Sequence, residues 1–186
     1  LGLSDRARRV PEHVVSTWDG IKVVDADALS AFEGRGAELA RARGRLILTP
    51  HPAELGRLLG TNAAEVGRDR YTAVARAAEL TGAVVLLKGA RTLVAAPGET
   101  TLVTAAGTPA LATAGAGDVR AGVLPALANP LAPRFAAILG AHVPARAAEA
   151  WAESTGADRG LIAREVADGI PDALARLAGA AEKMPD

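Results

Sequence analysis

The stretch Thr113-Ala114-Gly115-Ala116-Gly117-Asp118 decides the fold of this chain, because it follows a Gly/Pro-containing loop and opens an apolar, helix-like run at 119–127. Glycines at 115 and 117 let backbone N–H groups approach an anion closely, and the helix N-terminus behind them adds partial positive charge. The carboxylate of Asp118 would repel a phosphate held by these amides. Its presence is explained if Asp118 takes a proton from a hydroxyl that attacks the bound phosphoryl group. The alternative is an Asp that satisfies free amides in a first helical turn, and a short Gly-rich turn alone leaves both open.

Three further motifs precede this one, and each follows an apolar run typical of a β-strand. They are Asp25-Ala26-Asp27-Ala28-Leu29, Leu48-Thr49-Pro50-His51-Pro52-Ala53-Glu54-Leu55 and Leu86-Leu87-Lys88-Gly89-Ala90-Arg91-Thr92. Strands that alternate with helices predict βαβ units and a parallel sheet, which binds ligands beyond the carboxyl ends of its strands. We therefore expect the motifs to meet at one edge of a sheet.

The periodicity of apolar residues predicts the individual elements. Turn residues at 97–99 predict a hairpin, and Pro125 and Pro144 are expected to interrupt helices at a cost of about 3 kcal/mol each. We expect strands at 21–24, 45–48, 83–87, 92–96 and 100–104, and helices at 5–16, 52–59, 69–81, 119–127, 134–154 and 162–177, with an interrupted helix at 26–42.

Composition excludes several classes of protein. The 186 residues suit one α/β domain, and 49% are apolar although only two Trp, one Tyr and two Phe occur. Lys and Arg total 21, as do Asp and Glu, so no net field favours nucleic acid or an anionic membrane. The absence of Cys excludes disulfides and thiolate chemistry. With no long apolar run and no signal-peptide pattern, we expect a cytoplasmic protein without a membrane partner.

The order and spacing of the four motifs resemble the ribokinase-like superfamily and, within it, the NAD(P)H-hydrate dehydratases, which repair damaged nicotinamide cofactors. The resemblance runs from Leu1 to about Leu177. It implies a ribokinase-like three-layer α/β/α sandwich with a mostly parallel sheet, as a single domain over residues 1–186. The family has a Gly-Pro-Gly-Leu-Gly loop before the Asp-Ala-Asp strand. Leu1-Gly2 is either the tail of that loop, with the N-terminal part of the domain missing, or a chance dipeptide.

The segment from Lys88 to Thr92 has the chemistry of a nucleotide contact. A Lys can reach a phosphate, Gly89 lets the backbone come close and Thr92 offers a hydroxyl, although a strand-end Lys and a turn Gly explain the same residues. The resemblance implies that two groups of residues bind the adenine nucleotide: Lys88, Gly89, Ala90, Arg91 and Thr92, and the cradle of Gly115, Ala116 and Gly117.

His51 and Glu54 lie three residues apart at a helix start, so both can face one cleft. The resemblance implies that His51 contacts the substrate and that Glu54 acts on Mg²⁺ through water, while ordinary helix-N-terminal charge remains the alternative for Glu54. Three His and no Cys make a zinc site a poor explanation. Asp25 and Asp27 alternate at a strand end, so we expect one to face the cleft and the other to cap the next helix.

The activity implied by the resemblance is dehydration of hydrated NADH or NADPH, with ADP or ATP as co-substrate. Asp118 would deprotonate the hydroxyl of the hydrated ring, whose oxygen would take the terminal phosphoryl group and leave as phosphate. Mg²⁺, Lys88 and the amides of 115–117 would stabilise the transferring charge. The resemblance also implies a homo-oligomer and an epimerase partner or domain.

Two alternatives to the dehydratase stay open. One is a small-molecule kinase of the same superfamily, acting on a vitamin precursor or a sugar hydroxyl. The other is an inactive nucleotide-binding subunit, which is favoured by Pro125 and by Arg120, where the family usually has an apolar residue.

Overall fold

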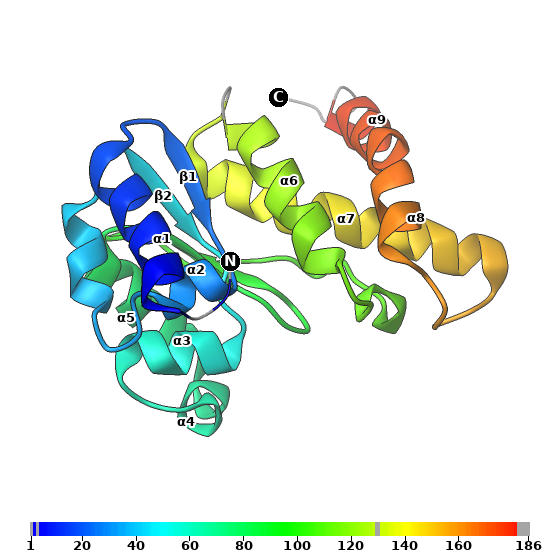
Figure 1. Ribbon diagram of the computed structural model, residues 1–186. Helices are drawn as coiled ribbons and strands as arrows, with labels where there is room; N and C mark the ends of the chain where they lie inside the picture. The colour runs from blue at the N-terminus through cyan, green and yellow to red at the C-terminus, as the bar shows by residue number, and fades with distance from the viewer. Residues whose placement is uncertain (1, 3, 129–130, 182–186) are drawn as a thin grey trace.

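A computed structural model describes residues 2, 4–128 and 131–181 and places one five-stranded sheet at the centre of the fold (Figure 1). The strands lie side by side in the order of the chain. The first strand pairs parallel with the second and the second with the third, whereas the third–fourth and fourth–fifth pairs are antiparallel. The fourth strand alone therefore runs against the others, and the sheet is mostly parallel. They are β1 (Ile21–Val24), β2 (Arg45–Leu48), β3 (Val84–Leu87), β4 (Leu93–Ala95) and β5 (Leu102–Val103).

Helices cover both faces of the sheet, because successive strand side chains point to opposite sides. Val85 and Leu87 join one core with the first five helices, whereas Val84 and Leu86 join a second core with the next two. The first layer holds α1 (Asp5–Thr17), α2 (Asp27–Ser30), the 3₁₀ turn η1 (Gly36–Arg41), α3 (Pro52–Leu59), α4 (Ala63–Arg68) and α5 (Arg70–Thr81). The other holds α6 (Ala116–Ala128) and α7 (Pro133–Thr155). The predicted three-layer ribokinase-like sandwich is confirmed.

The last two helices lie outside these layers. Figure 1 shows α8 (Ala163–Asp168) and α9 (Ile170–Ala181) beyond the sheet, packed along α7. Small cores of their own hold them there: Val166 packs with Ala148 of α7, and Ala173 of α9 packs with Val143 and Ala147. A second 3₁₀ turn, η2 (Pro109–Leu111), leads into α6. No helix in the described part of the chain has the length and apolar character to cross a membrane.

Most predicted elements are confirmed, and the differences follow from capping. The range 26–42 is a short helix and a separate 3₁₀ turn, because Gly34 takes a φ of +69° between them. The missed helix α4 is capped by Asn62, whose side chain accepts the N–H groups of Ala64 and Glu65. The predicted helix at 162–177 is two helices that meet at Gly169.

The expectation that Pro125 and Pro144 interrupt helices is wrong. Both lie inside continuous helices, α6 and α7. Pro125 is exposed, so water can satisfy the carbonyl that its ring leaves without a partner. Pro144 is buried among the core residues of the 23-residue helix α7, whose packing outweighs the local cost of about 3 kcal/mol.

Candidate functional site

Three of the four motifs meet at the carboxyl edge of the parallel strands. Asp25 directly follows β1, the Thr49–His51 segment follows β2, and Lys88 follows β3. The Lys88 N–H donates to the carbonyl of Pro50 at 2.8 Å, which joins two of these strand ends directly. The prediction that the motifs converge at one sheet edge is therefore confirmed for these three.

Lys88 forms the charged centre of this edge. Its Nζ lies 2.7 Å from Oδ1 of Asp25 and 3.6 Å from Oε2 of Glu54, and all three side chains are at most one-fifth exposed. One ammonium between two carboxylates leaves the group with a formal charge of −1. We call Asp25, Glu54 and Lys88 the Lys88 cluster. In this structure Lys88 contacts carboxylates, and its predicted contact with a phosphate stays a prediction.

His51 and Glu54 form a capping box at the start of α3. The Nδ1 atom of His51 accepts the N–H groups of Ala53 and Glu54 at 3.1 and 3.3 Å, and Glu54 Oε2 accepts the His51 N–H at 2.7 Å. An accepting Nδ1 assigns the proton of the neutral imidazole to Nε2, which lies 3.4 Å from Glu54 Oε1. The His51 side chain is half exposed, so its Nε2–H edge can also meet a ligand.

The start of α6 brings the fourth motif to the same place. Gly115 takes a φ of +82°, and a Cβ added there would lie 2.9 Å from the Cβ of Ala163. A Cβ added at Gly117 would lie 3.8 Å from Oδ2 of Asp25, so the start of α6 directly borders the Lys88 cluster. Asp118 is exposed in the first helical turn, where the helix dipole favours a carboxylate.

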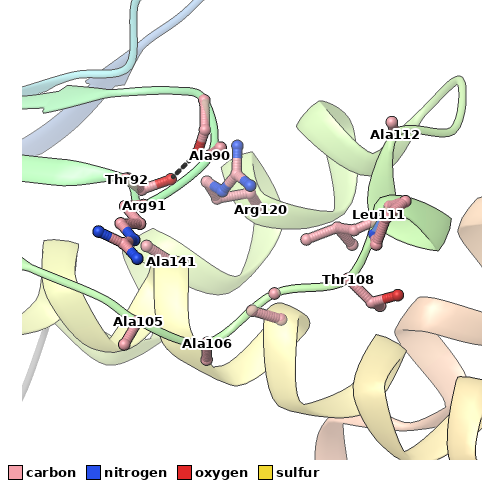
Figure 2. A pocket seen from close by; sticks show the side chains of 14 residues that line it. Ala90, Arg91, Thr92, Ala105, Ala106, Thr108, Leu111, Ala112, Arg120 and Ala141 are labelled. Atoms are coloured by element: carbon pink, nitrogen blue, oxygen red, sulfur yellow. Dashed lines mark hydrogen bonds between the residues drawn. The ribbon is translucent and has the colours of Figure 1, made fainter.

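A cavity of about 540 Å³ lies beside these motifs (Figure 2). This volume is within the usual range for a small-molecule ligand or cofactor. Four predicted nucleotide contacts line it, namely Gly89, Ala90, Arg91 and Thr92. The other predicted residues do not line the cavity, namely His51, Glu54, Lys88, Gly115–Gly117 and Asp118. Lys88 and Asp118 adjoin it through the chain, since Lys88 precedes Gly89 and Asp118 lies two residues before the lining residue Arg120.

The loop at 89–92 is held in an unusual backbone conformation. Gly89 has a φ of +142°, and Arg91 has a φ of +54°, a value that costs energy for a residue with a side chain. Arg70 donates from Nη1 to the carbonyl of Ala90 at 2.7 Å, and the Thr92 hydroxyl donates to the carbonyl of Gly89 at 3.2 Å, the dashed line in Figure 2. The loop thus presents a fixed wall to the cavity.

Sequence reasoning missed part of this wall and part of the cluster. The segment from Ala105 to Pro109 lines the cavity, and its only sequence signal was a Gly-Thr-Pro turn. The sequence left open which of Asp25 and Asp27 faces the cleft, and the structure pairs Asp25 with Lys88. Asp27 is the first residue of α2 and does not cap it. The N-cap residue is Ala26, and no side chain among the described residues caps this helix. Arg120 was noted only as a departure from the family, yet it lines the cavity.

The carboxylates of Asp25 and Glu54 are suited to bind Mg²⁺ through water rather than directly. No group of three or more His, Cys, Asp or Glu suited to a metal occurs among the described residues. Asp25 and Glu54 both face Lys88, so they offer few free oxygens for direct coordination. Mg²⁺ usually keeps several waters and binds one or two carboxylates together with substrate phosphates. The donor set therefore fits an ion held through water at Glu54 and Asp25, with phosphates supplying the other oxygens.

Comparison with known proteins agrees with this geometry. The fold is that of a ribokinase-like α/β protein: an Enterococcus faecalis protein of that superfamily, 19% identical, superposes with a TM-score of 0.74 over 95% of this chain and 60% of that chain. The sequence model of the NAD(P)H-hydrate dehydratase family matches residues 1–172, and this chain belongs to that family.

Relatives within the family are substantially longer than this chain. The ADP-dependent (S)-NAD(P)H-hydrate dehydratase of Neisseria meningitidis is 46% identical over 78% of this chain and 50% of its own length. The bifunctional NAD(P)H-hydrate repair enzyme of Moorella thermoacetica is 42% identical over 83% of this chain and 29% of its own. The ADP/ATP-dependent dehydratase of Bacillus subtilis, crystallised with ATP and Mg²⁺, is 27% identical and superposes with a TM-score of 0.81 over 95% of this chain and 61% of that chain. The chain thus spans half or less of the length of the Neisseria and Moorella relatives.

Proposed function

We propose that this chain dehydrates hydrated NADH or NADPH back to the reduced cofactor, with ADP or ATP as the co-substrate that activates the hydroxyl as a leaving group. Family membership supports the reaction. The observation that carries it to these residues is the start of α6: it borders the Lys88 cluster through Gly117 and leads into a cavity whose other wall is the 89–92 loop. A hydroxyl, a base and a phosphate donor can meet at such a junction.

Asp118 is the proposed catalytic base. It takes the proton of the ring hydroxyl, the freed oxygen pair forms a bond to the terminal phosphorus, and the nucleotide departs shortened by one phosphoryl group. The C–O bond then breaks with its electrons on the phosphate oxygen, the adjacent ring carbon loses a proton to solvent, and the C=C bond left by that proton's electron pair completes the reduced nicotinamide ring. Phosphate is a far better leaving group than hydroxide. Phosphorylation by the nucleotide therefore speeds a C–O cleavage that acid catalysis alone would leave slow.

The remaining residues bind and orient the two substrates. The loop at 89–92 forms the adenine-nucleotide side, and the amides of Gly115, Ala116 and Gly117 hold the transferring phosphoryl oxygens at a helix N-terminus. Lys88 also stabilises the negative charge of the transferring phosphoryl group. His51 contacts the hydrated ring from the end of β2. Glu54 would help to hold Mg²⁺ together with the phosphates, and the ion would supply neutralisation of their charge.

The deciding experiment follows the absorbance of reduced nicotinamide after hydrated cofactor is mixed with the chain and ADP or ATP. Recovery that requires a nucleotide supports the proposal and shows which nucleotide is used. A stable phosphorylated product without recovery would identify a small-molecule kinase. Nucleotide binding with neither product would identify an inactive binding subunit. The cytoplasmic location, the homo-oligomer and the epimerase partner stay predictions.

A further inference from the structure

Arg120 is a buried cation without a hydrogen-bonding partner among the described residues. It lies in α6, two residues after Asp118, and only 9% of it is exposed. Its Nε atom is buried and makes no hydrogen bond. Arg120 also lines the cavity, and Figure 2 shows its side chain rising from α6 toward the loop that holds Ala90.

Burial of this guanidinium is poorly compensated in the structure. Burial lowers the pKa of Arg120, and the charge of Asp25 acts in the opposite direction. The Lys88 cluster, with its formal charge of −1, offsets the Arg120 charge only without contact, because Asp25 accepts its hydrogen bond from the Lys88 ammonium at 2.7 Å and Arg120 Nε makes none. A buried charge without a hydrogen-bonded partner is costly, and Arg remains protonated even when buried.

The surroundings of Arg120 suit an anionic ligand with more than one oxygen. The neighbouring cavity walls include the methyl groups of Ala141 and Ala145, which keep the local dielectric low and strengthen any ion pair formed there. A guanidinium donates several N–H bonds in a planar fork that matches phosphate oxygens, whereas Lys88 already lies between two carboxylates.

We infer that Arg120 binds phosphate oxygens of the nucleotide in this cavity, as a cation that adds to the backbone cradle of α6. The inference rests on the proposed function for the identity of the ligand, a nucleoside di- or triphosphate. It assigns to Arg120 the discrimination between a nucleotide with a phosphate chain and a nucleoside without one. Ligand binding supplies the hydrogen-bond acceptors that the described residues do not provide to Arg120 Nε.

The test compares binding of ADP, AMP, adenosine and inorganic pyrophosphate by calorimetry, with the full chain, Arg120→Leu and Arg120→Lys. We expect Arg120→Leu to bind ADP and pyrophosphate about 10- to 100-fold more weakly, the loss of one charged hydrogen-bond pair, with adenosine affinity unchanged. Arg120→Lys should recover part of the loss. Arg76→Leu is the matched control, because Arg76 is exposed on α5 and does not line the cavity.

A second readout separates binding from folding. Arg120→Leu removes a buried charge, so its thermal midpoint without ligand should equal or exceed that of the unaltered chain. Equal ADP affinity in Arg120→Leu and the unaltered chain, or equal losses for ADP and adenosine, would overturn the inference, as would absence of nucleotide binding to the unaltered chain. ADP binding that depends on Arg120 without any dehydration would instead overturn the proposed function and leave the inference standing.

Discussion

At the scale of single residues, Asp118 combines exposure with a position in the first turn of α6, so its carboxylate is available to a substrate. Asp118→Asn keeps the shape and removes the base, and turnover should fall by about 10²- to 10⁴-fold, the usual contribution of a general base. Nucleotide affinity, measured by calorimetry, should stay nearly unchanged. Near-normal turnover in this variant would remove Asp118 from the mechanism.

His51 and Lys88 end different strands, and we expect them to serve different ligands. His51→Ala should weaken binding of the hydrated cofactor more than binding of ADP, and Lys88→Ala should do the reverse. Separate titrations of the two ligands measure both effects. Because His51 also caps α3, His51→Ala should lose about 1 kcal/mol of stability.

His51→Asn is the matched control for that pair, because Asn is a good helix cap without an imidazole. It should restore the stability that His51→Ala loses but not the affinity for the hydrated cofactor. Equal losses of affinity for both ligands in His51→Ala and in Lys88→Ala would contradict the division of the site into two sides.

At the scale of elements, α6 depends on the backbone of Gly115, the residue directly before it. Gly115→Ala forces a side chain into positive φ and against Ala163 of α8, so the free energy of unfolding should fall by about 1–3 kcal/mol in denaturant titrations. Gly122→Ala is the control in the same helix, where an added Cβ meets open space. It should raise stability by about 0.5–1 kcal/mol. Equal effects at both positions would show that the start of α6 is not under this constraint.

The same scale shows how far local sequence signals reach. The predicted bounds of β1, β2 and α3 agree with the structure, because apolar runs and strong caps such as His51 with Glu54 are local signals. The tolerance of Pro125 and Pro144 has no local signal, because it depends on the surroundings of each helix: Pro125 is exposed to water, and Pro144 lies in a helix that packs on the sheet and on α9.

At the scale of the whole molecule, β1 is an edge strand that pairs, in the described chain, with β2 alone. Beside it, Val10, Val14 and Trp18 follow one another at four-residue spacing and are 50%, 42% and 62% exposed. An unpaired edge next to exposed apolar side chains favours association between chains.

We therefore expect this chain to self-associate, as measured by sedimentation over a range of concentrations. Val14→Glu should shift the equilibrium toward monomer, because association would bury the new charge. Tyr71→Glu, at an exposed aromatic residue of α5, should not. A monomer at all concentrations would show that the surface of Val10, Val14 and Trp18 is not an interface between copies.

The sequence alone determined the strands and the strand-end position of Asp25, His51 and Lys88, because each depends on periodicity and turn chemistry within a few residues. The three-layer fold was implied by the resemblance that the four motifs carry. Only the tertiary structure decided that Lys88 lies between Asp25 and Glu54 and that Arg120 is buried beside the 89–92 loop. Lys88 and Asp25 are 63 positions apart, and their contact depends on how the sheet aligns its strands and how α6 packs against β1. Charge compensation inside a protein is set by such distant neighbours, which no local pattern encodes.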